Sequence, residues 1–238
     1  MLSRWGFIAL WLGTGVSTVF AATFSVTIRV VDADNKPVPK AVAATFWSGG
    51  AGMTADKAAI TDESGKAVVQ IDDWNEKRPV LVLSEDRKLG AVVGVTRADR
   101  EITARVGPTV RLKGKLECTE LKSKPAWANT MVSIEGLRAP FAQHMGQSAE
   151  FEFVLPAGTY SLRSYGTDVQ ELKHTVTLKA DRAEHDLGTL DLKATAVAKL
   201  KGKPMPEWQI TAARGVKPNV KLSDYKGKWV YLEFWGFW

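Results

Sequence analysis

The chain has 238 residues, of which 45% are hydrophobic and 24% charged, and its formal net charge is +6. This is ordinary globular composition, and the length predicts one or two domains with part of a third. Lysine and arginine are spread along the chain instead of forming a concentrated basic face with supporting aromatic residues, which argues against nucleic-acid binding.

Residues 1–21 have the layout of a secretory signal peptide. Arg4 supplies a short positive region, Trp5 to Phe20 are uncharged and mostly apolar, and a small-residue cleavage site ends at Ala21. The alternative is a membrane anchor, but the apolar stretch is shorter than the ~20 residues that a spanning helix needs. We therefore expect an exported chain, in the periplasm, the cell envelope or outside the cell, with no transmembrane segment after signal cleavage.

The next segment, residues 22–107, is predicted to be a β-sandwich. Phe24, Val26 and Ile28 alternate with polar residues, which indicates a half-buried strand. Turn formers fill residues 32–39, and Ala41 to Trp47 can form a second strand. Helical periodicity is missing from the rest of the segment, which favours an antiparallel sandwich. Its further strands are expected at residues 66–71, 80–83, 90–95 and 101–106.

Two stretches of this segment, "VVDADNKPVPKAVA" and "TDESGKAVV", resemble the carboxypeptidase regulatory-like domain, a small sandwich related in shape to prealbumin. The match covers about Thr23 to Val106. The resemblance implies a binding or spacer module without catalysis. The "DADN" within it also starts like a calcium loop, but the central Gly and the closing Glu of such a loop are missing. A turn held by Asp and Asn side chains explains it.

Gly107-Pro108 is predicted to separate this segment from a second β-sandwich, residues 108–193. "FEFVLPAGTYSLRSYG" outlines a hairpin whose turn is Pro156-Ala157-Gly158. The same stretch makes the second segment look like a more distant copy of the first, and the same family resemblance then implies another module without an active site.

Cys118 is the single cysteine of the chain, so an internal disulfide is impossible. It shares one face of a predicted strand with Val110, Leu112 and Leu116. That position favours a buried cysteine that acts as a small hydrophobic side chain. The alternative is a reactive or intermolecular thiol.

The three histidines, His144, His174 and His185, are too far apart in sequence for a zinc pattern, so no metal site is expected. His174 shares a strand face with Leu172 and Val176 and is expected to be partly buried. His144 falls in a stretch without alternation and is expected near the surface.

Residues 194–203 are predicted to be a linker whose lysines, Lys199, Lys201 and Lys203, lie in solvent. Residues 204–238 then begin a new unit. Its stretch "VKLSDYKGKWVYLEFWGFW" resembles the opening of a thioredoxin-like domain of the exported redoxin kind, in which a turn and an apolar strand lead to Phe-Trp-x-x-Trp-Cys-x-x-Cys. The matching residues are Leu222, Asp224, Gly227 and Lys228 in the turn, Val230, Leu232 and Phe234 in the strand, and Phe234, Trp235 and Trp238 after it.

This resemblance implies that a redox-active Cys-x-x-Cys should follow Trp238, and the chain as given stops before it. Thiol–disulfide exchange needs the thiolate. We therefore expect no catalytic residue, no cofactor and no turnover in this chain, and we expect its last ~30 residues not to fold alone. The resemblance gives Glu233, Trp235 and Trp238 accessory roles beside the missing redox site, with Glu233 helping to move protons. The simpler alternative is a Glu233 that faces solvent.

The predicted fold class is mainly β, with two tandem antiparallel β-sandwich (Ig/prealbumin-like) domains and an incomplete α/β thioredoxin-like fragment. One functional hypothesis is a fragment of an exported thiol–disulfide oxidoreductase, redox-inactive as given. The alternative is a non-enzymatic cell-envelope module that binds a protein or glycan, with its aromatic end at an interface. A third is addition of Trp229 to Trp238 as a strand to another protein's sheet. Composition and pattern leave the oligomeric state open.

Overall fold

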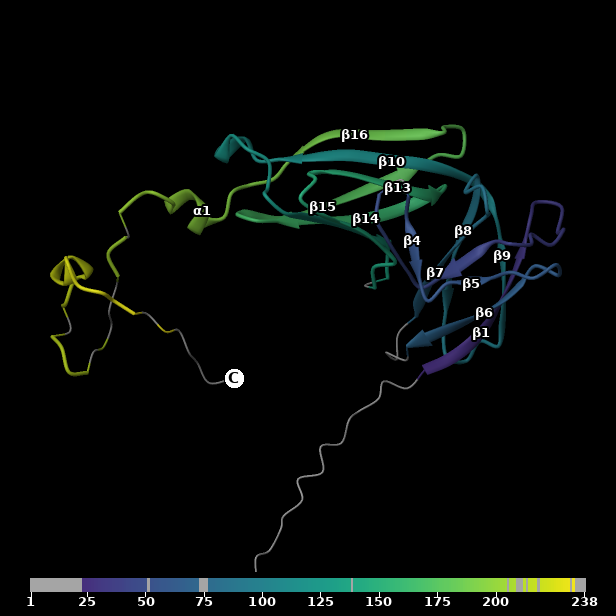
Figure 1. The fold of residues 1–238 in the computed structure, drawn as a ribbon, viewed down its shortest axis with the longest axis horizontal. Coiled ribbons are helices and arrows are strands. Elements are labelled where there is room, and N and C mark those ends of the chain that lie inside the picture. Colours follow the sequence, from purple (N-terminus) through teal and green to yellow (C-terminus); the bar gives the residue numbers. More distant parts are fainter. Residues whose placement is uncertain are drawn as a thin grey trace, which may run out of the picture.

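The structure is a computed structural model that describes residues 23–50, 52–72, 77–137, 139–204, 206–208, 212, 214–217, 219–231 and 233 (Figure 1). The predicted signal peptide, residues 1–21, lies outside them. The protein is mainly β, as the sequence predicts. Among the described residues, no helix is long and apolar enough to cross a membrane.

The described residues form sixteen strands in three sheets. The first sheet has the order β6 (Lys66–Asp72), β1 (Thr23–Val31), β9 (Glu101–Arg105). The second has the order β13 (Glu150–Pro156), β10 (Gly107–Glu117), β8 (Leu89–Val95), β7 (Arg78–Leu83), β2 (Val42–Ala44), β5 (Ala59–Ile60), and β16 (Glu184–Asp191) pairs with β10. The third has the order β15 (Val169–Leu178), β14 (Gly158–Gly166), β11 (Ala128–Ile134), β12 (Ala142–Gly146), β3 (Phe46–Ser48), β4 (Thr54–Asp56).

The sheets are mixed, whereas the sequence predicted antiparallel ones. Most pairs are antiparallel, but β1 pairs with β9, β10 with β16 and β12 with β3 in parallel. A hairpin can join only antiparallel neighbours, and these three pairs join strands that are distant in sequence. The alternation of polar and apolar residues within one strand does not indicate whether a strand that is distant in sequence pairs with it in parallel or antiparallel.

The first sheet packs on one face of β2, β7 and β8 and encloses the smaller of two cores. This first core is built of short aliphatic side chains, because alternate residues of each strand point to the same side. Its buried members are Val26, Ile28, Val30, Ala41, Ala43, Val69, Ile71, Val80, Val82, Ala91, Val95, Ala104 and Val106.

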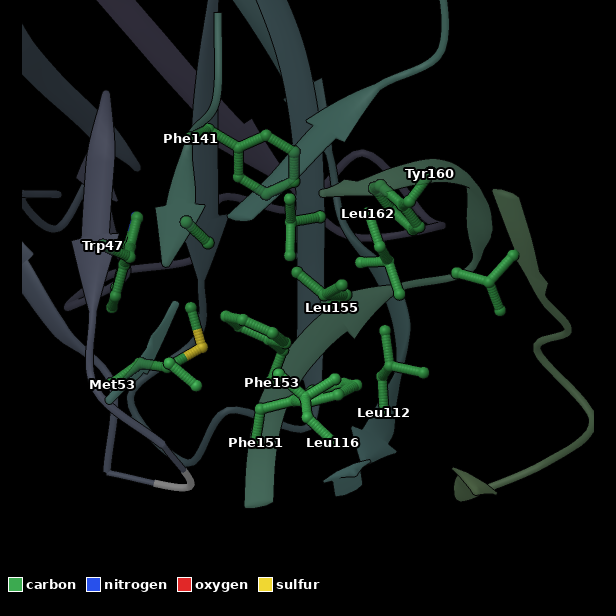
Figure 2. Close-up of a cluster of buried hydrophobic side chains, with 14 of the residues drawn as sticks. Trp47, Met53, Leu112, Leu116, Phe141, Phe151, Phe153, Leu155, Tyr160 and Leu162 are labelled. Atoms are coloured by element: carbon green, nitrogen blue, oxygen red, sulfur yellow. The ribbon is translucent and has the colours of Figure 1, made fainter. Parts of the chain in front are cut away.

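The larger core lies between the second and third sheets and draws on both halves of the chain (Figure 2). Trp47 and Met53 come from the first half and lie across the cluster from Leu112, Leu155 and Leu162 of the second half. The Trp47 indole N–H also donates a hydrogen bond of 3.3 Å to the Leu81 carbonyl. We call this cluster the shared core.

Strand β7 belongs to both cores. Val80 and Val82 point into the first core, and Leu81 and Leu83 point into the shared core. All four side chains are at most 1% exposed. A continuous apolar run is the pattern expected of a strand buried on both faces. The two cores therefore lie on opposite faces of the second sheet, and β2 also contributes to both, through Ala43 in the first core and Ala44 in the shared core.

The predicted strand from Ala41 to Trp47 is in fact two strands in different sheets. The chain leaves β2 in the second sheet, bends at Thr45 and enters β3 in the third sheet. The predicted boundary at Gly107-Pro108 lies at the start of β10, where these two residues pair with β8. Division into residues 22–107 and 108–193 stays a prediction, but strand pairing and the shared core cross it.

The two turn motifs of the first segment are held by Asp side chains, as predicted for "DADN". Asp32 Oδ1 accepts hydrogen bonds of 2.9 Å from the backbone N–H groups of Asp34 and Lys36. Asp62 Oδ1 does the same for Ser64 and Lys66. A hydrogen bond from the Ser64 hydroxyl, with those two N–H groups, holds the pKa of the Asp62 carboxyl below its ordinary value.

Residues 194–203, the predicted linker, contain helix α1 (Ala196–Leu200), which is docked on the sandwiches. Ala194 and Ala198 are buried in the shared core. Lys199 pairs with Glu120 at 2.9 Å, and Lys201 pairs with Asp168. The three lysines are exposed, as predicted, and two of them, Lys199 and Lys201, also have acidic partners at the surface. Acidic partners reach them from the 3₁₀ helix η1 (Thr119–Leu121) and from the turn before β15.

Candidate functional site

Of the three residues that the sequence assigned to a missing redox site, the structure describes only Glu233. It is exposed and lies outside any strand. Trp235 and Trp238 lie outside the described residues, so their predicted accessory roles stay predictions.

The segment from 204 to 233 has local contacts but no described strand. Trp208 donates an indole hydrogen bond of 2.9 Å to the Val220 carbonyl, and its ring lies edge-on to Tyr225 at 6.0 Å. The Glu207 carboxylate accepts a hydrogen bond of 2.9 Å from the Leu222 N–H at the start of the 3₁₀ helix η2 (Leu222–Tyr225). These contacts close a small loop, which Figure 1 shows well away from the sheets.

The apolar run that follows this loop is exposed. Trp229 is 103% exposed, Tyr231 87% and Val230 39%. The sequence predicted a strand here, and the described residues 229–231 and 233 are not in one. No described strand lies beside the run, so its backbone has no ladder to join.

Cys118 is 1% exposed at the end of β10, within the shared core. Its N–H donates to the Ser123 carbonyl at 2.9 Å, which closes the turn around η1. Burial among apolar residues agrees with the interpretation as a small hydrophobic side chain.

The histidines differ in their surroundings. His174 lies on β15 and is partly buried, as its strand face predicts. His144, expected in an irregular surface stretch, lies on β12 and is partly buried. Among the described residues, no group of three or more His, Cys, Asp or Glu side chains is placed to hold a metal ion.

His144 lines a cavity of about 460 Å³ beside strand β13. The cavity is bordered by β10 and β16 on one side and by β12 and Gly50 on the other. We call it the β13 groove. Its size falls within the range of small-molecule and peptide pockets. The polar side chains that line it are Lys113, Lys115, His144, Ser148, Glu150, Glu152, Asp186 and Thr189.

The cationic groups at the β13 groove already have acidic partners. Lys113 lies 2.7 Å from Glu184 and 3.4 Å from Asp186, and the hydrogen bond to Glu184 raises the pKa of its ammonium group. Lys115 pairs with Glu117, which raises its pKa in the same way. The two lysines are therefore held on the side of the groove that β10 and β16 form.

Two polar side-chain atoms in the groove lack a hydrogen-bond partner. His144 Nδ1 and Glu152 Oε1 are both buried, and neither has a hydrogen-bond partner. Glu152 Oε1 lies 3.0 Å from the Arg111 guanidinium, an ion pair without hydrogen-bond geometry. Burial lowers the pKa of His144, and the nearby Glu152 carboxylate opposes that shift only in part. A neutral imidazole carries one acceptor nitrogen, which suits an incoming donor.

Glycines shape the walls of the groove. A Cβ atom at Gly50 would lie 3.1 Å from His144 Cε1, so the absence of a side chain lets the backbone approach the ring. Across the groove, a Cβ atom at Gly114 would lie 2.6 Å from the Phe151 ring. Sequence reasoning predicted the β13–β14 hairpin but missed this groove. Its residues come from five separate segments, and nothing local in the sequence brings them together.

Comparisons with known proteins give fold likenesses only. No family model and no curated protein matches the chain. Among solved structures, the Bacillus anthracis TIE protein is 12% identical with a TM-score of 0.33, covering 72% of this chain and 34% of that one. A streptococcal ancillary pilin is 12% identical with a TM-score of 0.32, covering 73% and 63%. The group B streptococcus pilus 2b backbone protein is 10% identical with a TM-score of 0.32, covering 74% and 93%.

This chain therefore spans about a third of the TIE structure and under two thirds of the ancillary pilin. At such TM-scores the likenesses carry no functional argument. The fold itself places the chain among mainly β proteins built from packed sheets.

Proposed function

We propose that this protein is an exported, non-enzymatic β-sandwich module that binds a protein partner in the cell envelope. The observation that carries the proposal is the presence of two cores on opposite faces of the second sheet, with α1 docked on the shared core. Such a body holds its surface strands and the β13 groove in fixed geometry. Preformed geometry lowers the entropy lost on binding.

The carboxypeptidase regulatory-like resemblance supports the same proposal, because it implies a binding or spacer role for residues 22–107. Export rests on the predicted signal peptide, residues 1–21. Release of the chain by a secreting host, with a new amino terminus near Ala22, is the expected outcome. Retention of the chain inside the host cell with residues 1–21 still attached would contradict export.

The binding role is tested by affinity capture from the envelope fraction of the native host. The full chain and a chain ending after Lys203 are expected to capture the same partner, since both keep α1 and the two cores. A chain ending at Lys193 would remove the buried Ala194 and Ala198 and is a poor comparison. Capture that disappears when residues 204–238 are removed would place binding on the terminal segment and contradict the proposal.

A second proposal concerns residues 204–238, which we infer to be the opening part of a thioredoxin-like domain. It is supported by the matched turn and by the exposure of Trp229 and Tyr231, whose large apolar surfaces are normally covered in a complete domain. In this proposal Glu233, Trp235 and Trp238 are accessory to a redox site that this chain does not contain. The purified chain is expected not to accelerate insulin reduction by dithiothreitol; acceleration above the protein-free control would overturn this expectation.

A further inference from the structure

We propose that the β13 groove binds a short peptide in extended conformation, with the positively charged amino end of the peptide directed to His144 and Glu152. The inference rests on the proposed binding role and adds to it a site and a class of ligand. The backbone of β13, the two buried acceptors and the charges of the groove support it independently.

The backbone argument begins with the register of β13. The Leu116 N–H donates to the Ala149 carbonyl at 2.8 Å, so residues 149, 151, 153 and 155 direct their backbone groups toward β10. The backbone groups of Glu150, Glu152 and Val154 then point to the opposite edge. Within the described residues no strand pairs with that edge, because β13 is the last strand of its sheet.

Side chains already cover the two ends of this edge. The Glu150 N–H donates to the Ser148 hydroxyl at 3.2 Å, and the Val154 N–H donates to Met53 Sδ at 3.3 Å. Between them, the N–H and C=O of Glu152 face the groove. Four residues of strand span about 14 Å, which is room for an extended segment of about three residues. Strand addition to an open edge is an established mode of peptide recognition.

The buried acceptors indicate which end of the peptide enters. His144 Nδ1 and Glu152 Oε1 lack hydrogen-bond partners, and the Glu152 oxygen has only the Arg111 guanidinium at 3.0 Å. Buried polar atoms are normally hydrogen-bonded to protein, water or ligand. An ammonium group offers three donors and no acceptor, so it complements the Glu152 oxygen, and it complements His144 Nδ1 in the tautomer that carries its proton on Nε2.

The charges of the groove favour the same orientation. Lys113 and Lys115 are paired with acidic side chains on the side of the groove that β10 and β16 form. The Glu150 and Glu152 carboxylates line the groove on β13, where they lie opposite Lys115 and Lys113 in the β10–β13 ladder. An ammonium group that approaches the free edge of β13 therefore meets the β13 carboxylates before the lysines, because β10 lies on the other side of β13.

The experiment titrates the full ¹⁵N-labelled chain with trialanine and follows backbone amide shifts. We expect saturable shifts of the Glu152 and His144 amides with a dissociation constant of about 1 mM, a weak affinity suited to so small a ligand. N-acetyl-trialanine lacks the charged amino end and is expected to bind about tenfold more weakly. Propylamine supplies the ammonium group without a peptide backbone and is also expected to bind about tenfold more weakly.

Two variants locate the site. Gly50→Leu adds a side chain against the His144 ring and is expected to abolish the shifts, and His144→Phe is expected to weaken binding about tenfold. His174→Phe changes the partly buried histidine on β15 and is the matched control, which should bind trialanine as the parent chain does. The amide spectrum of each variant reports whether it is folded.

Absence of saturable shifts with trialanine in the folded parent chain would overturn the inference. Equal binding of propylamine and trialanine would overturn its peptide part, and equal binding of N-acetyl-trialanine would overturn the assigned orientation. If trialanine does not bind but partner capture survives His144→Phe, the groove is rejected as the binding site and the proposed binding role remains. If the folded parent chain captures no partner from the envelope fraction, the proposed binding role itself is rejected.

Discussion

Strand β7 and the run from Trp229 to Glu233 have similar apolar sequences and opposite surroundings. Val80, Leu81 and Val82 of β7 are 0% exposed, whereas Trp229 and Tyr231 are 103% and 87% exposed. β7 has β2 and β8 as ladder partners and a core on each face. The terminal run has no described strand beside it. The comparison teaches that an apolar pattern specifies a buried strand only where neighbours satisfy its backbone and cover both faces.

The largest expected difference between the two regions is in stability. Leu81→Ala should lower the free energy of unfolding by about 3 kcal/mol, because it leaves a cavity where the second and third sheets meet. Val230→Ala at a site 39% exposed should change it by less than about 0.5 kcal/mol. Urea unfolding followed by circular dichroism measures both. Similar losses for the two variants would contradict the assignment of the terminal run to solvent.

A substitution on the other face of β7 sharpens the comparison. Val82 lies in the first core, so Val82→Ala should cost about 2 kcal/mol. Because β7 joins the two cores, the slowest-exchanging amides of β14, which lies over the shared core, should lose protection by a similar amount. Hydrogen exchange by NMR measures this. Unchanged protection in β14 would mean that the two cores open independently.

Limited proteolysis compares the same regions kinetically. Trypsin should cut first after Arg214 and Lys221, which are exposed and outside any strand. It should cut after Arg111 and Lys113 of β10 at least about tenfold more slowly, since cleavage there requires the sheet to open. Mass spectrometry of early fragments identifies the sites. Early cleavage within β10 would contradict this order.

The smallest expected effect is a pH dependence of α1 docking. Hydrogen bonds from Lys199 and from the Ala194 N–H hold the pKa of Glu120 below its ordinary 4.5. The ionised carboxylate therefore stabilises docking above that value, and the contribution is lost as the pH falls through the lower folded-state pKa. Between about pH 6 and about pH 3, the protection of the Ala194 amide against exchange should fall.

Glu120→Gln provides the control for this pH dependence. The amide side chain keeps an acceptor for the Ala194 N–H but does not titrate. Its protection factor at Ala194 should vary less with pH than that of the parent chain. An equal pH dependence in both chains would assign the effect to another group.

Local features of the fold could be predicted from the sequence. Alternation identified β1 and the buried face of β10, including Cys118, and the Pro156-Ala157-Gly158 turn identified the hairpin of β13 and β14. Each of these depends on side-chain period or turn chemistry within about ten residues.

Features that depend on distant partners could not be predicted. The pairing of Trp47 with Ala142 joins β3 to β12 across the chain, and nothing near either residue specifies it. The position of His144 follows from that pairing, which the sequence around His144, without alternation, does not indicate. The continuous apolar run of β7 was the one available signal that the two halves share a core, because it predicts burial on both faces.

The position of β7 between two cores restricts how this protein can be altered. A residue in that strand must fit one packing environment while its neighbour fits another, so a compensating change on one face cannot relieve a misfit on the other. Neither half can be moved into another protein as an independent unit, because each half supplies side chains to the core on which the other half depends. New binding properties are therefore more readily acquired at the sheet edges and in the segment after α1 than by exchange of either half.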